Sequence, residues 1–234
     1  SGNGNTGTLT NMTGTEWTTG KIGGALSFDG SNDRISLPTA LLNGASSFST
    51  ALWLNLNNAS GTRYSISAAH ATNDNAFLVG HTNNNLLVHF KGGSGNVGFN
   101  SGWTSVWKHL AITRSSGPTD PLKVYVDGSS VLSVSPSGAG ALTVDANGLW
   151  FGGDQDSVGG NFSSSQQLAG LLDDFRIYDR ALSETEVAIL STGEESRIRG
   201  TVGTPFSYEA EARLGPTSFT ATNLPPGLTI DNAG

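Results

Sequence analysis

Cysteine is absent from this 234-residue chain, and charged residues are scarce. Without cysteine the protein has no disulfide framework, no thiolate metal site and no cysteine nucleophile. Charged residues make up only 13% of the chain, so serine, threonine and asparagine must carry much of the surface hydration. A surface of that kind suits a secreted protein and a hydroxyl-rich ligand.

Positive charge and long apolar runs are also lacking. Lysine and arginine together number 12 and are scattered singly, under a formal net charge of -7. This pattern contains no basic stripe, so we expect no nucleic-acid partner. No run approaches the roughly 20 apolar residues of a membrane span, so we predict no membrane-spanning segment. The chain starts inside a turn-rich segment and stops without a closing element, so we expect it to be part of a larger protein.

Glycine is abundant, with 32 residues, and only one segment has a helical pattern. Many short strands joined by tight turns are therefore expected. Alternating and continuous apolar runs predict strands at 25–28, 34–37, 48–56, 64–69, 77–80, 86–90, 97–99, 107–114, 122–126 and 149–151. Asp127-Gly128 predicts a type I′ hairpin turn. The fold class is all-β, with the strand spacing of a sandwich.

The run from Leu168 to Tyr178 predicts the closing strand of this sandwich. It is apolar at most positions, as expected of a strand that is covered on both faces. Simple alternation puts Asp173 on the same face as Phe175 and Ile177. One carboxylate is therefore expected to point toward the apolar side.

A short helix follows the closing strand. Ser183 and Glu186 form a capping box, in which each residue satisfies a free backbone N–H of the other, and Gly193 fits the helix end. Beyond the helix the composition changes to a charged linker and then to a further strand-rich segment. The expected organisation is a sandwich domain at 1–192, a linker at 193–200 and a truncated second domain at 201–234.

Several segments together resemble a known family. The motifs are GNGNTGTL, WTTGKIGGALSFDGSNDRISLP, WKHLAITR, KVYVDGSSV and GLLDDFRIYDRALSETEV. In this order, over about 1–191, they are similar to the laminin G-like members of the concanavalin A-like superfamily. The resemblance implies a jelly-roll sandwich of two curved antiparallel sheets.

The C-terminal segment carries a second resemblance. GTVGTPFSYEAEA with PTSFTATNLPPGLTID is similar to the first half of an immunoglobulin-like repeat of bacterial surface proteins. That resemblance implies an extracellular protein, secreted or on the cell surface of a bacterium. Neighbouring immunoglobulin-like domains of the same parent chain are the implied partners.

Catalysis is not expected, although glycosidases and polysaccharide lyases share this superfamily's fold. The Glu-x-Asp-x-x-Glu run of jelly-roll glucanases is absent, and no glutamate lies on a predicted central strand. Asp173 and Asp174 are adjacent, so they point to opposite faces and cannot flank one substrate. A lyase would need one of the imidazoles as a base, namely His70, His81, His89 or His109.

Calcium is the expected cofactor, in a structural role. It prefers oxygen ligands from carboxylates and backbone carbonyls. Asp29, at a predicted hairpin tip, and Asp173 could meet if the first and last strands are neighbours, as they are in laminin G-like folds. In the alternative interpretation, each Asp accepts local backbone N–H bonds. Asp154 and Asp156 form a weaker acidic cluster.

Carbohydrate binding needs an exposed aromatic ring and polar groups that bond sugar hydroxyls. Trp17 and Trp103 lie in glycine-rich turns and are the candidate stacking rings. The candidate polar groups are on loops, with Asp154 and Asp156 among them, and plain solvation is the alternative. The loops are Thr72–Asn75, Thr82–Asn85 and Gly152–Gln167, the last of which is expected to be exposed.

The sequence thus predicts a non-catalytic extracellular recognition module, stabilised by calcium, that binds a glycan or another surface ligand. A purely structural or adhesive spacer is the alternative. A second alternative is a polysaccharide lyase or glycoside hydrolase with an unusual site.

Overall fold

The structure is a computed structural model, and it describes residues 4–14, 16–98 and 102–193. The chain divides into two compact units, Ser1–Glu195 and Ser196–Gly234. The predicted immunoglobulin-like segment at 201–234, with nearly all of the predicted linker, lies outside the described residues. Within the described ranges no helix is long and apolar enough to cross a membrane.

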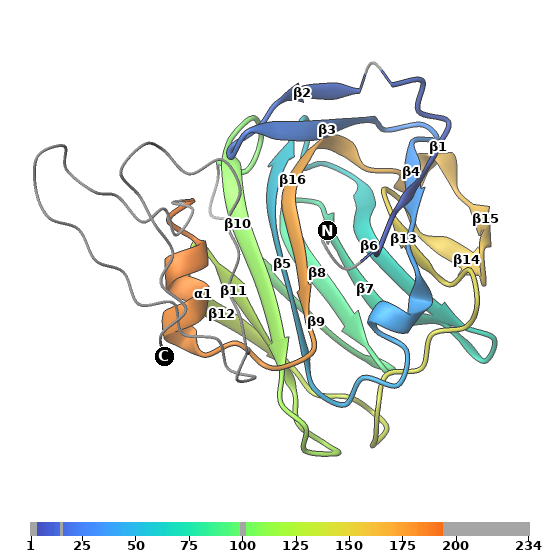
Figure 1. Cartoon of the computed structure of the whole chain (residues 1–234), viewed down its shortest axis with the longest axis vertical. Coiled ribbons are helices and arrows are strands. Elements are labelled where there is room, and N and C mark those ends of the chain that lie inside the picture. The colour runs from blue at the N-terminus through green and yellow to red at the C-terminus, as the bar shows by residue number, and fades with distance from the viewer. Residues whose placement is uncertain (1–3, 15, 99–101, 194–234) are drawn as a thin grey trace, which may run out of the picture. The chain divides into compact units, whose positions relative to one another are not determined.

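Two antiparallel seven-stranded sheets form the domain (Figure 1). Sheet A contains, in spatial order, β1 (Thr8–Thr10), β4 (Arg34–Ser36), β13 (Leu149–Phe151), β6 (Thr62–His70), β7 (Asn73–Thr82), β8 (Asn85–Phe90) and β9 (Gly93–Gly98). Sheet B contains β12 (Ser129–Val134), β11 (Leu122–Val126), β10 (Trp107–Arg114), β5 (Phe48–Leu56), β16 (Ala169–Tyr178), β3 (Gly24–Asp29) and β2 (Trp17–Thr19). The predicted all-β sandwich is confirmed.

The remaining elements lie outside the two sheets. They are the 3₁₀ turns η1 (Thr39–Leu41) and η2 (Ser164–Gln166), the small hairpin of β14 (Gln155–Ser157) and β15 (Gly160–Phe162), and the helix α1 (Glu184–Leu190). In Figure 1 α1 is at the left of the sandwich and the β14–β15 hairpin is at the right.

The core fills the space between the sheets because alternate residues of each strand turn inward. On β5 the inward residues are Phe48, Leu52, Leu54 and Leu56, which belong to the main core cluster. Ala51 belongs instead to a second cluster, on the outer face of sheet B. Both faces of β5 are therefore buried, which explains why its sequence does not alternate between apolar and polar residues from Ala51 to Leu54.

Helix α1 covers that outer face. Val187 from the helix packs in one cluster with Ala51, Ala111 and Tyr125 from the sheet and Leu182 before the helix. The predicted capping box is present, since the Ser183 hydroxyl accepts from the Glu186 N–H and the Glu186 carboxylate accepts from the Ser183 N–H.

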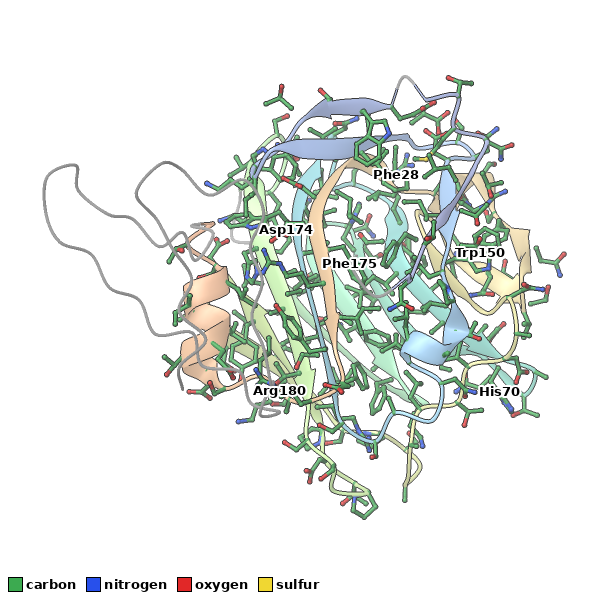
Figure 2. The ribbon with its side chains drawn as sticks, viewed as in Figure 1. Phe28, His70, Trp150, Asp174, Phe175 and Arg180 are labelled. Atoms are coloured by element: carbon green, nitrogen blue, oxygen red, sulfur yellow. The ribbon has the colours of Figure 1, made fainter. Side chains whose placement is uncertain are left out.

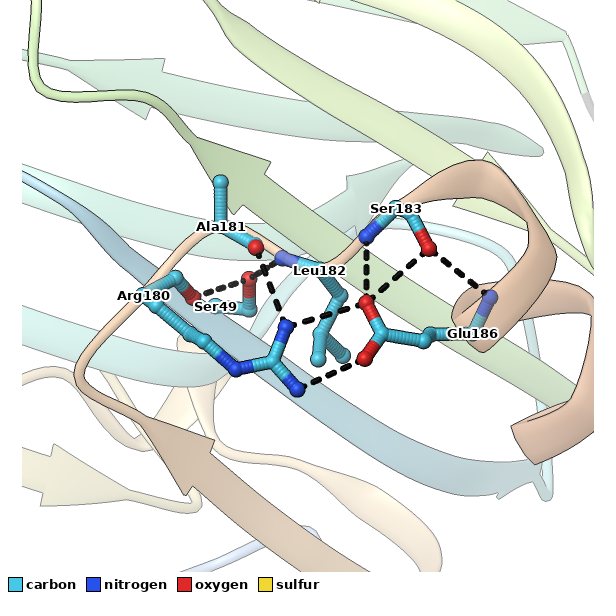
Figure 3. A network of polar contacts seen from close by, with 6 residues as sticks. All are labelled: Ser49, Arg180, Ala181, Leu182, Ser183 and Glu186. Atoms are coloured by element: carbon cyan, nitrogen blue, oxygen red, sulfur yellow. Dashed lines mark hydrogen bonds and ion pairs between the residues drawn. The ribbon is translucent and has the colours of Figure 1, made fainter. Parts of the chain in front are cut away.

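The same carboxylate holds the chain that enters the helix (Figure 3). Arg180 donates to both Glu186 oxygens, at 2.9 and 2.7 Å. The Arg180 guanidinium, and then the Ser183 N–H and hydroxyl, lower the pKa of Glu186 to about 2. The Ser49 hydroxyl on β5 donates to the Arg180 carbonyl and accepts from the Leu182 N–H, both at 2.8 Å.

Glu186→Gln should therefore lower the free energy of unfolding by about 1 kcal/mol at neutral pH, because it removes a charge-assisted cap. The folded-state pKa of Glu186 is depressed, so its stabilisation is present above the unfolded pKa of about 4.5 and is lost as pH falls toward 2. Urea titrations at several pH values test this. The exposed Glu184 on the same turn provides the matched control Glu184→Gln, and equal losses in both variants would contradict the prediction.

The β14–β15 hairpin and its flanks cover the outer face of sheet A. The loop Gly152–Gln167 was expected to be exposed because of its polarity, and this expectation is wrong at Asp154, Gln155 and Gln167, which are buried. The Gln155 side chain donates to the Ser67 hydroxyl and carbonyl on β6 and to the carbonyl of Gly148. Polar residues can be buried here because these hydrogen bonds replace those to water.

A β-bulge divides β16 between Asp173 and Arg176. Before the bulge, Asp173 lies opposite Trp53 of β5. After it, Arg176 lies opposite Ala51, another residue of the outer face. Asp174, within the bulge, has a positive φ of 44°. The extra residue shifts the alternation by one position.

Because of the bulge, Asp173 does not lie on the face that simple alternation predicts. Phe175, which is labelled in Figure 2, packs on Phe151 of the opposite sheet, with ring centroids 4.2 Å apart. Ile177 also contacts the main core. Asp173 lies on the outer face with Trp53 and not with these two residues. No carboxylate of this strand therefore points into the apolar interior.

Candidate functional site

Asp29 and Asp173, the expected calcium ligands, are not brought together. In the pairing of β3 with β16, Asp29 lies opposite Ala169, four positions along the strand from Asp173. At about 3.3 Å per residue the two positions are roughly 13 Å apart. A calcium ion cannot be shared over that distance, because its ligands lie within about 2.6 Å of it.

Each of these carboxylates also has local partners. Asp29 accepts the N–H groups of Ser31 at 2.7 Å and Asn32 at 3.2 Å. Partial burial acts to raise the pKa of Asp29, but these N–H groups outweigh it and lower the pKa. Asp173 accepts the N–H groups of Ile22 and Asp174, both at 2.7 Å. The two residues tie turns together, and the expectation of a calcium site shared by them is corrected.

The two candidate stacking tryptophans differ in exposure. Trp17 is 61% exposed on β2, an edge strand of sheet B. Trp103 is only 7% exposed and belongs to the main core cluster. Its neighbour Thr104 forms a bridge with Leu56, which ties this segment to the sheet. Trp103 therefore cannot offer a ring face to a sugar, and its expected role is corrected.

Two of the predicted polar loops meet in one groove at the rim of the sandwich. This groove, hereafter the acidic groove, has a volume of about 460 Å³ and lies between the β6–β7 turn and β14. Its lining consists of His70, Ala71, Thr72, Asn73, Asp74, Asp156, Ser157 and Val158. Figure 2 marks His70 at the end of β6.

Contacts with Asp145 hold the β6–β7 turn in place. The carboxylate of Asp145 accepts the Ala71 N–H at 2.8 Å and lies 3.8 Å from the His70 imidazole. His70 also shares a hydrogen bond of 3.0 Å with the Thr72 hydroxyl. The wall of the groove is therefore fixed, while Asp74 keeps partial exposure.

Asp154 does not line the acidic groove and is only 4% exposed, but it interacts electrostatically with Asp74 and Asp156, which do line it. Burial, the negative charge of Asp156 and, more weakly, that of Asp74 raise the pKa of Asp154 to about 6. The Ser67 hydroxyl donates to it at 3.3 Å, which offsets part of the effect. At neutral pH this carboxylate is charged, buried and close to two like charges, a combination that favours a bound cation.

One enclosed side-chain oxygen on η2, the Oε1 of Gln166, has no hydrogen-bond partner among the described residues. Both η2 and β14 pack against β6. Within the described ranges, no group of three or more His, Asp or Glu side chains is arranged to hold a metal ion alone. Any cation here would need backbone, amide, water or ligand oxygens beside Asp154 and Asp156.

The sequence pointed to parts of this site but not to the whole. Asp154, Asp156 and the loop Thr72–Asn75 are candidate ligand-binding groups from the sequence, and His70 is a candidate base; the structure brings His70, part of this loop and Asp156 into one lining. Nothing in the sequence indicates that Asp154 is buried. That burial depends on contacts with β6, which sequence spacing does not reveal.

Two facing antiparallel sheets, with a polar groove at one rim, define a jelly-roll domain of the lectin-like class. The chain matches the family model described as the concanavalin A-like lectin/glucanases superfamily, in its laminin G-like branch, over residues 29–188. This protein therefore belongs to that family.

Among curated proteins, human pentraxin-4 is 35% identical over 89 residues, which are 38% of this chain and 18% of the relative. Among solved structures, domain 4 of AbnA, a GH43 extracellular arabinanase from Geobacillus stearothermophilus, was determined in complex with arabinotriose. It is 25% identical, with a TM-score of 0.58, and the match covers 79% of this chain and 87% of that domain.

Two further structures share the fold at lower identity. A heptameric SAP-like pentraxin from Limulus polyphemus is 21% identical, with a TM-score of 0.55 and coverage of 69% and 76%. The binding domain of botulinum neurotoxin serotype G is 19% identical, with a TM-score of 0.59 and coverage of 82% and 47%.

Proposed function

We propose that this domain is a non-catalytic, extracellular recognition module that binds glycan in the acidic groove with the help of a calcium ion. The observation that carries the proposal is the buried carboxylate of Asp154, which interacts electrostatically with Asp74 and Asp156 in the lining of the groove. A cation at Asp154 and Asp156 would offset their repulsion and leave coordination positions for sugar hydroxyls. Asn73 and Thr72 would bond further hydroxyls.

The comparisons support the ligand class. The arabinanase domain that matches this chain over most of its length was solved with an oligosaccharide, and it comes from an extracellular enzyme. Other solved relatives are binding domains of toxins. The larger bacterial surface or secreted protein, with immunoglobulin-like repeats after the linker, stays a prediction from the sequence.

Binding to immobilised polysaccharides, arabinan among them, tests the proposal with the full 234-residue chain. We expect retention on at least one polysaccharide in calcium and its loss in EDTA. Asp156→Asn should weaken retention at least tenfold, because the groove loses an exposed charged ligand. Asp179→Asn, which removes an exposed carboxylate elsewhere, should have no effect.

Three results would count against the proposal. Retention on no polysaccharide would favour the structural spacer. Retention that Asp156→Asn leaves unchanged would place the binding elsewhere, with Trp17 as the next candidate because of its exposed ring. Release of oligosaccharide products would show an enzyme.

A further inference from the structure

We infer that the domain has a second, independent binding groove, on the outer face of sheet B, for a neutral polyhydroxylated ligand such as a monosaccharide. This groove, hereafter the hydroxyl groove, has a volume of about 360 Å³. It is lined by Thr113, Ser115, Asp120, Pro121, Lys123, Tyr125, Ala181, Leu182, Ser183 and Glu184. None of these residues lines the acidic groove.

The floor offers hydroxyl groups that no protein atom uses. Tyr125 is only 2% exposed, and its ring packs in the cluster beneath α1. In the described part of the chain, neither the Tyr125 hydroxyl nor the Thr113 hydroxyl has a hydrogen-bond partner. Neither is among the enclosed polar atoms, so both open into the groove. Each can donate one hydrogen bond to a ligand and accept others.

The wall facing this floor is rigid. It is the segment Ala181–Glu184, which the network in Figure 3 holds at both ends. Ser49 bonds the backbone of Arg180 and Leu182, and Glu186 bonds Ser183 and the Arg180 guanidinium. A ligand that enters the groove therefore does not have to order this segment, which lowers the entropic cost of binding.

The charges around the groove favour a neutral ligand. Lys123 and Glu184 face each other across the rim at 3.7 Å and are both well exposed. Asp120 accepts the Gly117 N–H at 3.1 Å and remains the one further charged group of the lining. A single, paired lysine beside two carboxylates disfavours a phosphate or sulfate ligand. Hydroxyls of the ligand can bond Tyr125, Thr113 and Asp120 at once.

The two grooves lie on opposite faces of the sandwich. The acidic groove adjoins β14, which packs on sheet A, whereas the hydroxyl groove adjoins α1, which packs on sheet B (Figure 1). A module with both sites occupied could link two glycan chains. The inference about the hydroxyl groove does not depend on the proposed function of the acidic groove.

Titration of the ¹⁵N-labelled 234-residue chain with single monosaccharides tests the inference. Glucose, galactose, mannose, xylose and arabinose are added in EDTA, so that calcium-dependent binding in the acidic groove does not contribute. We expect at least one sugar to shift the amide resonances of Thr113, Lys123 and Ser183. Tyr125→Phe should weaken that binding about tenfold, because one hydrogen bond is lost while the buried ring remains.

Thr113→Val is the second variant, and Ser94→Ala, which removes an exposed hydroxyl from sheet A, is the matched control. Equal melting temperatures of Tyr125→Phe and wild type would show that the packing is intact. The inference is supported if Tyr125→Phe or Thr113→Val weakens binding at least fivefold and Ser94→Ala does not. It is overturned if no sugar shifts these amides, or if both variants bind like wild type.

Discussion

Asp154→Asn should stabilise the metal-free protein at pH 7.5 and remove part of its pH dependence between about pH 4 and pH 6. The folded state raises the pKa of Asp154 from 3.8 to about 6, mainly through burial and then through Asp156. Below the unfolded value the carboxyl is neutral in both states and costs nothing. As pH rises from the unfolded value to the folded value, the unfolded state ionises first and stability falls; above the folded value both states carry the charge and the loss is complete.

The size of this effect follows from the shift. About two pKa units correspond to a gain on the order of 3 kcal/mol when the charge is removed. Asparagine keeps an oxygen that can accept the Ser67 hydroxyl, but its amide group also adds two N–H donors at this buried position, which reduces the gain where they find no acceptor. Urea unfolding in EDTA across pH 4 to 8 measures the difference between the two proteins.

The difference in unfolding free energy between the two proteins must be taken at each pH, because two histidines change stability with pH in the opposite direction. Burial lowers the pKa values of His81 and His109 to about 4. Their stabilisation is complete above the unfolded pKa of about 6.5 and is lost as pH falls toward 4. Both histidines remain in Asp154→Asn, so subtraction isolates the carboxylate.

In calcium the wild type should become more stable than Asp154→Asn, the reverse of their order in EDTA. A ligand that binds the folded state stabilises it by mass action, and only the wild type keeps the buried ligand. We expect calcium to raise the unfolding free energy of the wild type at pH 7.5 and to have little effect on Asp154→Asn or below pH 5. If calcium stabilised both proteins equally, or if Asp154→Asn were the less stable protein in EDTA, the account of this site would be wrong.

Arg114→Leu should have the largest effect on stability. Arg114 is 1% exposed at the end of β10, and its guanidinium donates to backbone carbonyls of three separate segments. The acceptors are the carbonyl oxygens of Ser46, Gly117, Pro118 and Gly140. Its Cζ atom lies 5.1 Å from the centre of the Phe90 ring. Leucine would fill part of the space but remove all four hydrogen bonds. In the described part of the chain the Ser46 carbonyl would keep no other donor, whereas those of Gly117, Pro118 and Gly140 would keep the Asp120 N–H, the Gly140 N–H and the Lys91 ammonium.

Each lost hydrogen bond from the charged guanidinium costs about 1 kcal/mol or more, so we expect a loss of at least 3 kcal/mol. For a domain of this size that loss lowers the melting temperature by roughly 6–12 °C. The stability of Arg114→Lys should lie between those of wild type and Arg114→Leu. A single ammonium keeps the charge but cannot bond the carbonyls of all three segments at once. Calorimetry of the three proteins decides, and a loss below 1 kcal/mol for Arg114→Leu would refute the role assigned to it.

This loss should extend to the hydroxyl groove. Gly117 and Pro118, which Arg114 bonds, lie in the loop that carries Asp120. Nearby, Lys91 bonds the carbonyls of Ala139, Gly140 and Ala141 and so holds the opposite loop. Arg114 and Lys91 together organise one end of the sandwich.

Local patterns in the sequence determined the strands, the turns and the helix start. Asp127 and Gly128 have φ angles of 48° and 80°, as the type I′ turn requires. The capping box of Ser183 and Glu186 formed as predicted. Both depend on neighbouring residues alone, so the sequence contains all the information that they need.

Only the tertiary structure decided which side chains share a site. The bulge in β16 moved Asp173 to the outer face, and Trp103 entered the core although it follows a glycine-rich turn. Asp156 and the Thr72–Asn75 loop were each recognisable as polar, but strand register brings them to one groove. The burial of Asp154 depends on hydrogen bonds to β6, which lies far away along the chain. Long-range pairing sets burial and charge contacts, and no local pattern encodes them.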